Sequence, residues 1–469
     1  MSNRSLLQAA IAAHRFGLGE PALEALAGDP QGWLLAQIGP ADAPRGAGLL
    51  STREGLALIA AEREKRELAK NPPPGMTATE LLAGHYREST IADARSHLLS
   101  AALAARPFNE RLQLFWANHF TVSLIKGSAR GLVGAFERDA IRPHIAGPFG
   151  TLLAASTMHP AMLRYLDNSQ SAGPDSRVVV RERRRAARAG EAPRVSGINE
   201  NLAREVLELH TLGAASGRGG AGGHAGYTQA DVTAFAEVLT GWRIGQSDTG
   251  ATPPFNPNWH EPGRKMLLGK SYPEGPDALG QVLHDLALHP ATARFVSTKL
   301  ARHFVADEPP PALVERLATA WLRSAGDLPT VYRELVRSPE AWSPEQRKLK
   351  TPEEFVISSV RLLGTDPRRF ERGDGLGIGA LGQRILAAPS PAGWSDRADD
   401  WLGPDAVWKR VEWATRTADR AGRNVDARAL AARSLGPLLG IASQAQIERA
   451  ADGPQALALL LMAPEFQRR

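Results

Sequence analysis

Helix-start signals recur along this chain of 469 residues, whereas the strict alternation of apolar and polar residues that marks a β-strand is scarce. Thr77 and Glu80 have the spacing of a capping box and predict a long helix over residues 77–105. Thr228 and Asp231 repeat that spacing with aspartate in place of glutamate. The pattern predicts an all-α protein, a large multi-helix globular assembly of roughly fifteen helices or more, with little or no sheet.

Long loops rich in glycine, proline and tryptophan separate the expected helices. Residues 245–276 and 387–404 form two of these loops, and we expect a short hairpin near residues 265–268 in the first. Residues 213–226 form a glycine-rich tract that neither Gly-Lys-Ser nor Gly-Lys-Thr follows. The tract therefore predicts a flexible linker and not a phosphate-binding loop.

The length and the apolar content together allow a large hydrophobic core. Hydrophobic residues make up 43% of the chain, which excludes disorder of the whole protein. We predict a single domain over residues 1–469 with three sub-lobes and one basic mobile loop. The sub-lobes are residues 1–170 (N-terminal helices), 197–345 (central helices and loops) and 350–469 (C-terminal helices), and the loop is residues 171–196.

The positive charge of the chain is concentrated in the predicted basic loop. The net charge is +6, and residues 176–194 hold seven arginines against two glutamates. This arginine loop is either a solvated mobile segment or a site for an anionic ligand such as a phosphate or an anionic polysaccharide. It contains no aromatic residue on which bases could stack, so nucleic acid is not an expected partner.

Cysteine is absent, which removes disulfides, thiolate metal ligands and cysteine nucleophiles. The apolar run at residues 5–13 is too short for a leader and lacks a cleavage site behind it. No window approaches the length of a membrane span. We therefore expect a soluble protein in the cytoplasm, with the periplasm as the open alternative.

The helix predicted over residues 200–211 carries the highest density of ionisable groups. Arg204, Glu205, Glu208 and His210 are the candidate catalytic residues of a polar site on this helix. Two carboxylates in one cleft take different pKa values, as acid–base catalysis requires. The alternative is an exposed charged face, because Arg204 and Glu208 also have the spacing of an ordinary helix ion pair.

A divalent metal is the one cofactor that the residue types suggest. Asp167, His210 and His260 are the candidate ligands, since zinc, manganese and iron bind imidazole and carboxylate groups. No local His-Glu-x-x-His pair is present, so tertiary contacts would have to assemble such a site. The alternative is a structural role for each histidine, as a helix cap or a core residue.

Four further residues are candidates for substrate binding: Asn168, Trp242, Lys265 and Trp394. Asn168 follows the candidate ligand Asp167, and the other three lie in or beside the long loops. Tryptophans in such loops either line a carbohydrate or ligand groove or pin the loop to the body of the protein. The loop that carries His260 is long enough to act as a lid.

Several motifs of this chain occur together in one known family. They are FWANHFTV at 115–122, IRPHIAGPFGTLL at 141–153, HPAMLRYLDN at 159–168, NENLARE and LELHTLG within 199–213, GYTQADVTAFAEVLTGW at 226–242, HPATARFVSTKLARHFV at 289–305, KTPEEFV at 350–356 and the Gly-Trp that ends at Trp394. With them the chain resembles the bacterial family of proteins of unknown function numbered 1800. The motifs and their surroundings contain the histidines His119, His159, His210, His260, His289 and His303.

The resemblance implies no specific reaction, but it does imply a shared pathway with another protein. The family has no established reaction, and its members are often encoded beside a sulfatase-like family that is also of unknown function. That neighbourhood implies a sulfatase-like partner protein and a role at the cell envelope. Two features depart from the family pattern: the loop before Tyr227 is longer and richer in glycine, and residues 260–261 read His-Glu where His-Asp is expected.

Three classes of function therefore stay open. The first is an enzyme, metal-assisted or not, with its polar site on helix 200–211 and an envelope-related substrate. The second is a non-catalytic binding protein for an anionic glycan or peptide. The third is a structural partner of the sulfatase-like protein. An interior cluster of histidine with carboxylates favours the first class, and exposed tryptophans beside the arginine loop favour the second.

Overall fold

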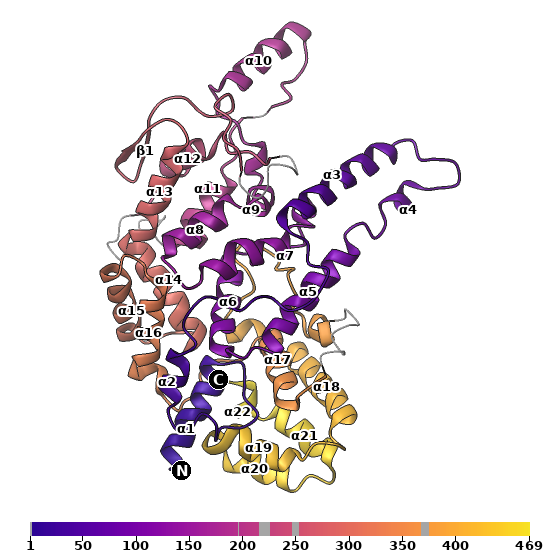
Figure 1. Cartoon of the computed structure of the whole chain (residues 1–469), viewed down its shortest axis with the longest axis vertical. Coiled ribbons are helices and arrows are strands. Elements are labelled where there is room, and N and C mark those ends of the chain that lie inside the picture. Colours follow the sequence, from indigo (N-terminus) through magenta and orange to yellow (C-terminus); the bar gives the residue numbers. More distant parts are fainter. Residues whose placement is uncertain (1, 196, 215–225, 246–252, 367–374) are drawn as a thin grey trace.

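The computed structural model describes residues 2–195, 197–214, 226–245, 253–366 and 375–469. Within these ranges the chain forms 22 α-helices and one hairpin of two short strands, so the all-α prediction is confirmed. The molecule is elongated, with the N-terminal and C-terminal helices at one end and the helix α10 at the other (Figure 1). Among the described helices, none is both long and apolar enough to cross a membrane.

The N-terminal third of the chain supplies nine helices and several short π and 3-10 turns. The α-helices are α1 (Asn3–Ile11), α2 (Pro30–Leu35), α3 (Thr52–Leu68), α4 (Ala78–Leu82), α5 (Arg87–Ala102), α6 (Pro107–His119), α7 (Val133–Phe136), α8 (Phe149–Met158) and α9 (Pro160–Tyr165). The π and 3-10 turns among them are η1 (Ala12–Phe16), η2 (Gly127–Ala129), η3 (Glu137–Ile141), η4 (Arg142–His144) and η5 (Asn168–Gln170). Prolines in the first turn of α6 and α9 preset the helical backbone angle there.

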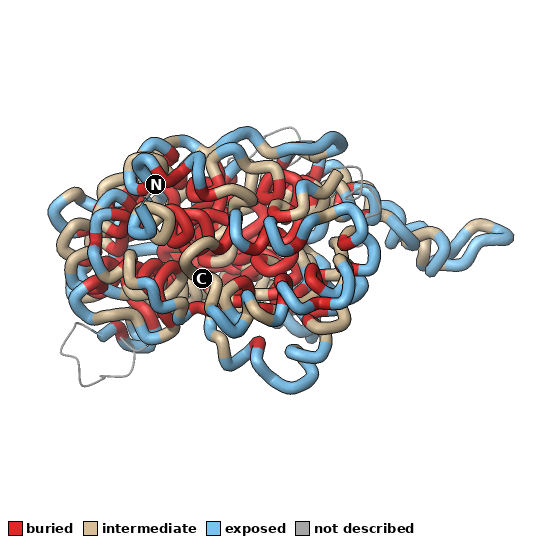
Figure 2. The backbone as a smooth tube through the Cα atoms, turned by 90° about the horizontal axis from the view of Figure 1, so that it is seen from below, coloured by how far each residue is buried: buried red, intermediate tan, exposed pale blue. Residues whose placement is uncertain are grey.

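Helices α3 and α4 form an arm that extends from the body (Figures 1 and 2). Residues 57–85 of this arm include no buried residue. The prediction of a single helix over residues 77–105 is wrong, because α4 ends at Leu82 and α5 begins only at Arg87. Gly84 between them has φ +70°, a left-handed backbone that breaks the run of helical residues.

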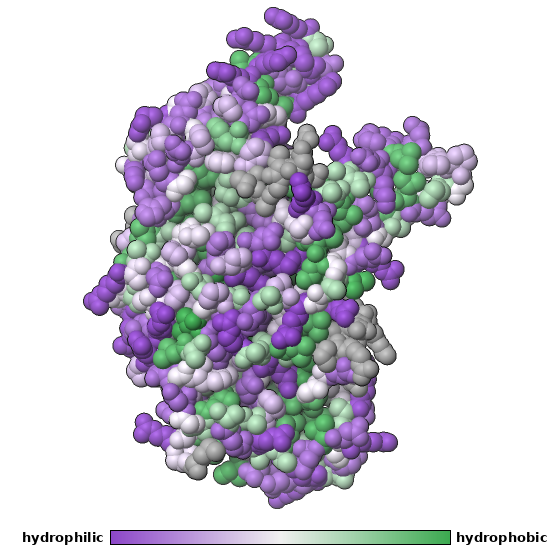
Figure 3. All heavy atoms as spheres, viewed as in Figure 1, coloured by the Kyte–Doolittle hydropathy of each residue, from purple (hydrophilic) through white to green (hydrophobic). Residues whose placement is uncertain are grey.

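Residues 177–189 are the helix α10 (Arg177–Ala189), so the prediction of a loop over this segment is wrong. Arginine and alanine are strong helix formers, and the density of charge hid that propensity. Ser176 caps the N-terminus by accepting a hydrogen bond from the Val179 amide, and Gly190 ends the helix in the left-handed region. Helix α10 projects from the end of the molecule (Figure 1), and its tip is strongly hydrophilic (Figure 3).

The central segment contains the two helices expected on either side of the glycine-rich tract. Helix α11 (Asn201–Glu205) continues into the π-helical turn η6 (Val206–Thr211), and α12 (Gln229–Leu239) begins at the capping box of Thr228 and Asp231. The predicted hairpin is confirmed as β1 (Lys265–Leu267) paired antiparallel with β2 (Lys270–Tyr272). Most of the predicted linker lies outside the described residues.

The described residues of the C-terminal half supply ten further α-helices. The α-helices are α13 (Asp277–Leu288), α14 (Pro290–Phe304), α15 (Pro311–Arg323), α16 (Leu328–Arg337), α17 (Pro352–Leu363), α18 (Pro404–Ala421), α19 (Ala427–Leu435), α20 (Ile441–Glu448), α21 (Gly453–Met462) and α22 (Pro464–Gln467). The short 3-10 turns are η8 (Pro339–Trp342), η10 (Gly375–Leu381), η11 (Ala398–Trp401) and η12 (Gly436–Leu438).

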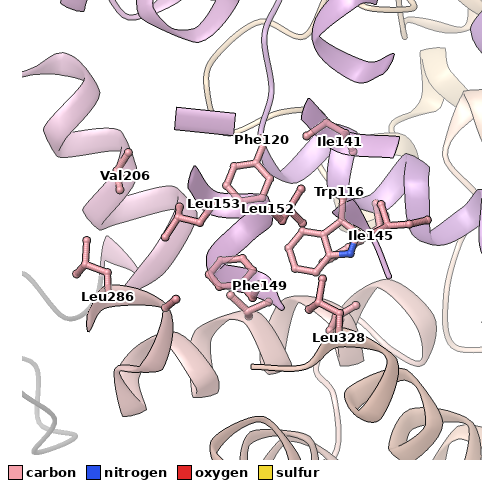
Figure 4. Close-up of a cluster of buried hydrophobic side chains, with 14 of the residues drawn as sticks. Trp116, Phe120, Ile141, Ile145, Phe149, Leu152, Leu153, Val206, Leu286 and Leu328 are labelled. Carbon is pink, nitrogen blue, oxygen red and sulfur yellow. The ribbon is translucent and has the colours of Figure 1, made fainter. Parts of the chain in front are cut away.

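Two buried hydrophobic clusters hold these helices together. The larger cluster draws residues from both the first and the second predicted sub-lobe, which therefore share one core. A second cluster lies among α17 to α22 and takes Leu18, Leu98 and Leu99 from the N-terminal part. Figure 4 shows the aromatic centre of the larger cluster, where Trp116 of α6 and Phe120, the residue that follows α6, face Phe149 of α8. The buried residues, red in Figure 2, occupy the interior of the body.

Candidate functional site

The helix over residues 200–211 presents its charged residues at the surface of the body. Arg204 is 38% exposed and contacts Glu200 at 3.1 Å and Glu208 at 3.7 Å. Glu205 is half-buried, and burial together with the neighbouring Glu208 raises its pKa. Tyr227 donates its phenol to Glu208. The group is therefore a partly exposed network of helix ion pairs and does not enclose an interior cavity.

His210 lies on the opposite, buried face of the same helix. Its ring is 1% exposed and packs 4.9 Å from the ring of Phe120 and 6.0 Å from that of His119. Neither ring nitrogen has a hydrogen-bond partner among the described residues. Burial, and then the nearby Lys299, lowers the pKa of His210 to about 3. His210 is thus a neutral ring in an aromatic core, separated from the carboxylates with which it was grouped.

Asp167 and Asn168 each have partners outside helix 200–211. Asp167 has a left-handed backbone, with φ 60°, and its carboxylate contacts the Lys126 amine at 2.5 Å. Asn168 donates its amide to the Leu239 carbonyl at 3.2 Å. The two residues therefore connect the segment after α9 to its neighbours, and no contact joins them to Glu205 or Glu208.

His260 and Lys265 hold the long loop that precedes the hairpin. The ring nitrogens of His260 bond the Thr240 carbonyl at 2.8 Å and the Gly275 amide at 3.1 Å. Lys265 donates to the carbonyls of Gly263 and Glu261. Both ring nitrogens of His260 therefore have protein partners, and these hydrogen bonds hold the loop in place. The described ranges contain no group of three or more His, Asp or Glu side chains placed to hold one metal ion, and the structure does not bring the three candidate ligands together.

The two candidate tryptophans have different surroundings. Trp242 packs against Phe255, with ring centroids 5.3 Å apart, and pins the loop to α12. Trp394 instead lines a cavity and lies 5.9 Å from the ring of Trp401. Asn118 fixes the Trp394 backbone with two hydrogen bonds, of 2.9 and 2.8 Å. Gly393 allows this approach, because an added Cβ would meet the Asn118 carbonyl at 2.5 Å.

The cavity that Trp394 lines has a volume of about 310 Å³, and many ionisable side chains lie on its wall. Its walls come from α5, α6, α14, α17 and the segment 383–397. Ala392 and Arg397 are exposed, so the cavity reaches solvent on that side. The ionisable side chains on the wall are His97, Arg111, His119, Glu137, Lys299, Arg302, His303, Glu353, Glu354, Asp396 and Arg397.

Helix α14 contributes three of these side chains from one face. Lys299, Arg302 and His303 are three and four residues apart, which places them side by side on a helix. The other face of α14 buries Val296, Leu300 and their neighbours in the large core. An ordinary amphipathic helix thus turns its polar stripe toward the cavity and not toward bulk water.

His303 forms a hydrogen-bonded pair with Asp396. Its Nδ1 lies 3.3 Å from Asp396 Oδ2, and its Nε2 has no partner among the described residues. Burial would raise the pKa of Asp396, but His303 and the buried Lys348 outweigh it and lower that pKa to about 2. Burial lowers the pKa of His303 despite the opposing effect of Asp396. A neutral imidazole therefore faces an ionised carboxylate.

His97 lies between two carboxylates on the opposite side of the cavity. Its Nδ1 is 3.1 Å from Glu137, and its Nε2 is 2.5 Å from Glu353. Burial alone would lower the pKa of His97, but the two glutamates raise it well above the ordinary value. His97 is therefore a cation whose nitrogens both donate to protein carboxylates, and it ties α5 to α17.

Glu354 is the buried centre of a second ionic group. Its carboxylate contacts Arg111 at 2.5 Å and Arg469 at 2.8 Å. Burial would raise the pKa of Glu354, but Arg469 and Arg111 together lower it below its usual range. The same side chain caps α17 by accepting a bond from the Thr351 amide. One carboxylate thus fixes the start of α17, the end of the chain and the floor of the cavity.

Comparison of the sequence with known protein families shows to which family the chain belongs. A family model described as protein of unknown function (DUF1800) matches residues 11–468, nearly the whole chain. The chain belongs to the DUF1800 family. Comparison with curated proteins found no match, and comparison with solved structures found none either.

Sequence reasoning found part of this DUF1800 cavity and missed the rest. It identified Trp394 as a ligand-binding candidate and singled out the motif histidines His119 and His303. It missed Lys299, although the Lys-Leu-Ala-Arg-His segment shows the spacing of a helix face. It also missed the partners of His97, because 256 residues separate His97 from Glu353.

Proposed function

We propose that the cavity is the active site of an enzyme that performs acid–base chemistry on a small polar substrate. The observation that carries this proposal is the His303–Asp396 pair on the cavity wall. A base oriented by a carboxylate, with its second nitrogen unpartnered beside a cavity, is the arrangement that proton transfer requires. The proposal moves the site from helix 200–211 to α14.

The protonation states support a general base. Because Asp396 is ionised, it accepts the proton of His303 Nδ1, which leaves the lone pair on Nε2. That lone pair takes a proton from a substrate group or from a water molecule in the cavity. The imidazolium that forms is stabilised by the Asp396 carboxylate and returns the proton to the product. Asp396 is itself held by Lys348, whose side chain is completely buried.

The family resemblance adds two elements to the proposal. We retain an envelope-related substrate and a sulfatase-like protein that acts in the same pathway. Both rest on the usual neighbourhood of the family and not on a contact in this chain. The volume of about 310 Å³ lies at the low end of ligand sites, which favours a small fragment over a polymer.

The test is turnover of a mixture of small metabolites and soluble envelope fragments, followed by mass spectrometry. We expect the wild-type protein to convert at least one compound. His303→Gln should lower that rate by about 100-fold or more, since general bases contribute at least that factor. His284→Gln, at an exposed histidine of α13, is the matched control and should keep the wild-type rate. Equal turnover by His303→Gln would place the chemistry elsewhere.

The arginines of α10 favour a second function, the binding of a polyanionic ligand. Arg177, Arg181, Arg184 and Arg188 lie on one face of the helix, opposite the buried Val179. None of the four forms an ion pair with a residue that the structure describes. A straight row of cations without partners is complementary to a linear polyanion such as an anionic glycan.

Heparin, as a model linear polyanion, tests this second function. The wild-type protein should bind a heparin column and elute at a salt concentration that depends on the arginine row. Changing all four arginines of the row to glutamine should lower that salt concentration clearly, while changing Arg323 on α15 should not. Elution of both variants at the wild-type position would exclude the row as a binding surface.

A further inference from the structure

Two cations on the cavity wall lack the carboxylate partners that the other charged wall residues have. Lys299 and Arg302 of α14 form no ion pair with any residue in the described part of the chain. The other cations of the same wall all have carboxylate partners: Arg111 pairs with Glu354, His97 with Glu137 and Glu353, and Arg397 with Glu308. On this part of the wall, α14 therefore presents two positive charges without a neighbouring carboxylate.

The hydrogen bonds of these two side chains leave most of their donors free. Arg302 donates its Nε to the Asp307 carbonyl at 3.0 Å, and its terminal nitrogens have no protein acceptor among the described residues. The Lys299 amine lies 5.7 Å from the ring of Phe295 and has no oxygen partner in the described ranges. A guanidinium and an amine one turn apart match the two oxygens of one carboxylate or phosphate group.

Burial makes the missing partner significant. A half-buried cation without a counter-charge is unfavourable, and natural proteins pair such groups or use them to bind an anion. Burial, with help from Arg302, lowers the pKa of Lys299 to about 8 against the opposing effect of Asp396. The amine is therefore still mostly protonated at pH 7. His119 adds an independent sign of a ligand, because its buried Nδ1 has no described partner and its ring lines the cavity.

We propose that Lys299 and Arg302 form an oxyanion-binding subsite that holds a carboxylate or phosphate group of the substrate. The inference rests on the proposed function for the rest of the substrate and adds its chemical class, a small organic anion. Helix spacing then fixes the relation of the two parts of the site, since His303 follows Lys299 by four residues and Arg302 by one. The bound anion would place the adjacent part of the substrate beside the general base.

Isothermal titration of the wild-type protein with inorganic phosphate and, separately, with malonate tests the subsite. Sodium chloride at matched ionic strength is the reference. We expect at least one of the two anions to bind beyond chloride, and the stronger one identifies the group. Arg302→Gln and Lys299→Gln should each weaken that binding about tenfold or more, since a charge-assisted pair is lost.

Three controls separate a ligand role from a structural one. Arg294→Gln lies on the same helix, at an exposed residue paired with Glu315, and should bind the anion like the wild type. Binding by the wild type should weaken above about pH 8 as Lys299 loses its proton, and Lys299→Arg should remove that weakening. His303→Gln should keep anion binding even though turnover is lost.

The outcomes distinguish this inference from the proposed function. Absence of binding beyond chloride, or equal binding by Arg302→Gln and the wild type, overturns the subsite and leaves the His303 proposal untouched. Anion binding that depends on Lys299 and Arg302, in a protein whose turnover does not depend on His303, supports the subsite and overturns the proposed base. A pH-independent affinity in the wild type would remove Lys299 from the subsite.

Discussion

The continuous helical segment of α11 and η6 and the helix α14 carry similar sets of residues and use them in opposite ways. Each has an arginine and a histidine within two turns, and each has a carboxylate close by. Along α11 and η6 the charged residues form ion pairs that stay partly exposed, and His210 is buried among aromatic rings. On α14 the lysine, the arginine and the histidine all line one cavity, and His303 has a carboxylate partner.

The difference shows what a helix pattern can and cannot specify. Spacing decides which side chains share a face of a helix. It does not decide what lies opposite that face. Arg204 is partly exposed to solvent, whereas Lys299 lines the same cavity as segments 353–354 and 394–397. The density of charge along the sequence was therefore a poor guide to the position of the cavity.

The largest difference between the two regions should appear when one carboxylate is neutralised. Glu354→Gln should lower the free energy of unfolding by roughly 3–5 kcal/mol, because it leaves Arg111 and Arg469 buried without their counter-charge. Urea unfolding followed by circular dichroism measures this. The matched control is Glu412→Gln on α18, whose pair with Arg416 is exposed and should be worth less than about 1 kcal/mol. Similar losses for both variants would contradict the view that burial sets the value of these pairs.

The next largest effect is on the pH dependence of stability, to which the buried residues His210 and His97 should contribute with opposite signs. The folded pKa of His210 is lowered, so the unfolded chain binds its proton first, and stability falls as pH drops below about 6.5. The slope is about 1.4 kcal/mol per pH unit, or about 2 kcal/mol between pH 6.5 and 5. His210→Phe should remove this part of the acid destabilisation, as measured by urea unfolding across that range.

His97 should give the opposite dependence of stability on pH. Its folded pKa is raised, so its contribution is complete below about pH 6.5 and is lost as pH rises through the folded value. His97→Gln should therefore lower stability on the acid side and reduce its decline toward alkaline pH. If His97→Gln and His210→Phe changed the pH profile in the same direction, the assignment of charged and neutral histidines would be wrong.

A smaller effect is expected on the charged face of the segment formed by α11 and η6. Glu205→Gln and Glu208→Gln should each change the free energy of unfolding by less than about 1 kcal/mol, because the face is partly exposed and screened. Thermal and urea unfolding of the two variants measure this. A loss of roughly 3 kcal/mol or more would show that the face is an enclosed polar network, as the enzyme hypothesis for helix 200–211 requires.

The smallest effect on stability is expected on α10. Arg184→Gln and Arg188→Gln should change the free energy of unfolding by no more than about 0.5 kcal/mol, since both side chains are exposed and unpaired within the described chain. Limited trypsin digestion of the wild type should nevertheless cut first within residues 177–194, because few contacts hold this projecting segment. A first cut elsewhere, shown by peptide mapping, would mean that α10 is docked more firmly than its exposure indicates.

Local rules predicted the secondary structure well and failed at two identifiable places. The capping boxes at Thr77 and Thr228 both form as the spacing requires. Gly84 ended a helix that the capping signal alone extended too far. In α10 the charge pattern was given more weight than the helix propensity of arginine and alanine, and a helix was taken for a loop.

The sequence by itself determined the all-α class, the starts of the main helices and the residues that share each helix face, because these depend on neighbours within about four positions. It also placed the chain in the DUF1800 family. Only the tertiary structure decided which polar face encloses a cavity. His97 meets Glu353 across 256 residues, and Arg469 meets Glu354 across 115. Such contacts depend on how whole helices pack, and no local pattern encodes which charges will be buried together.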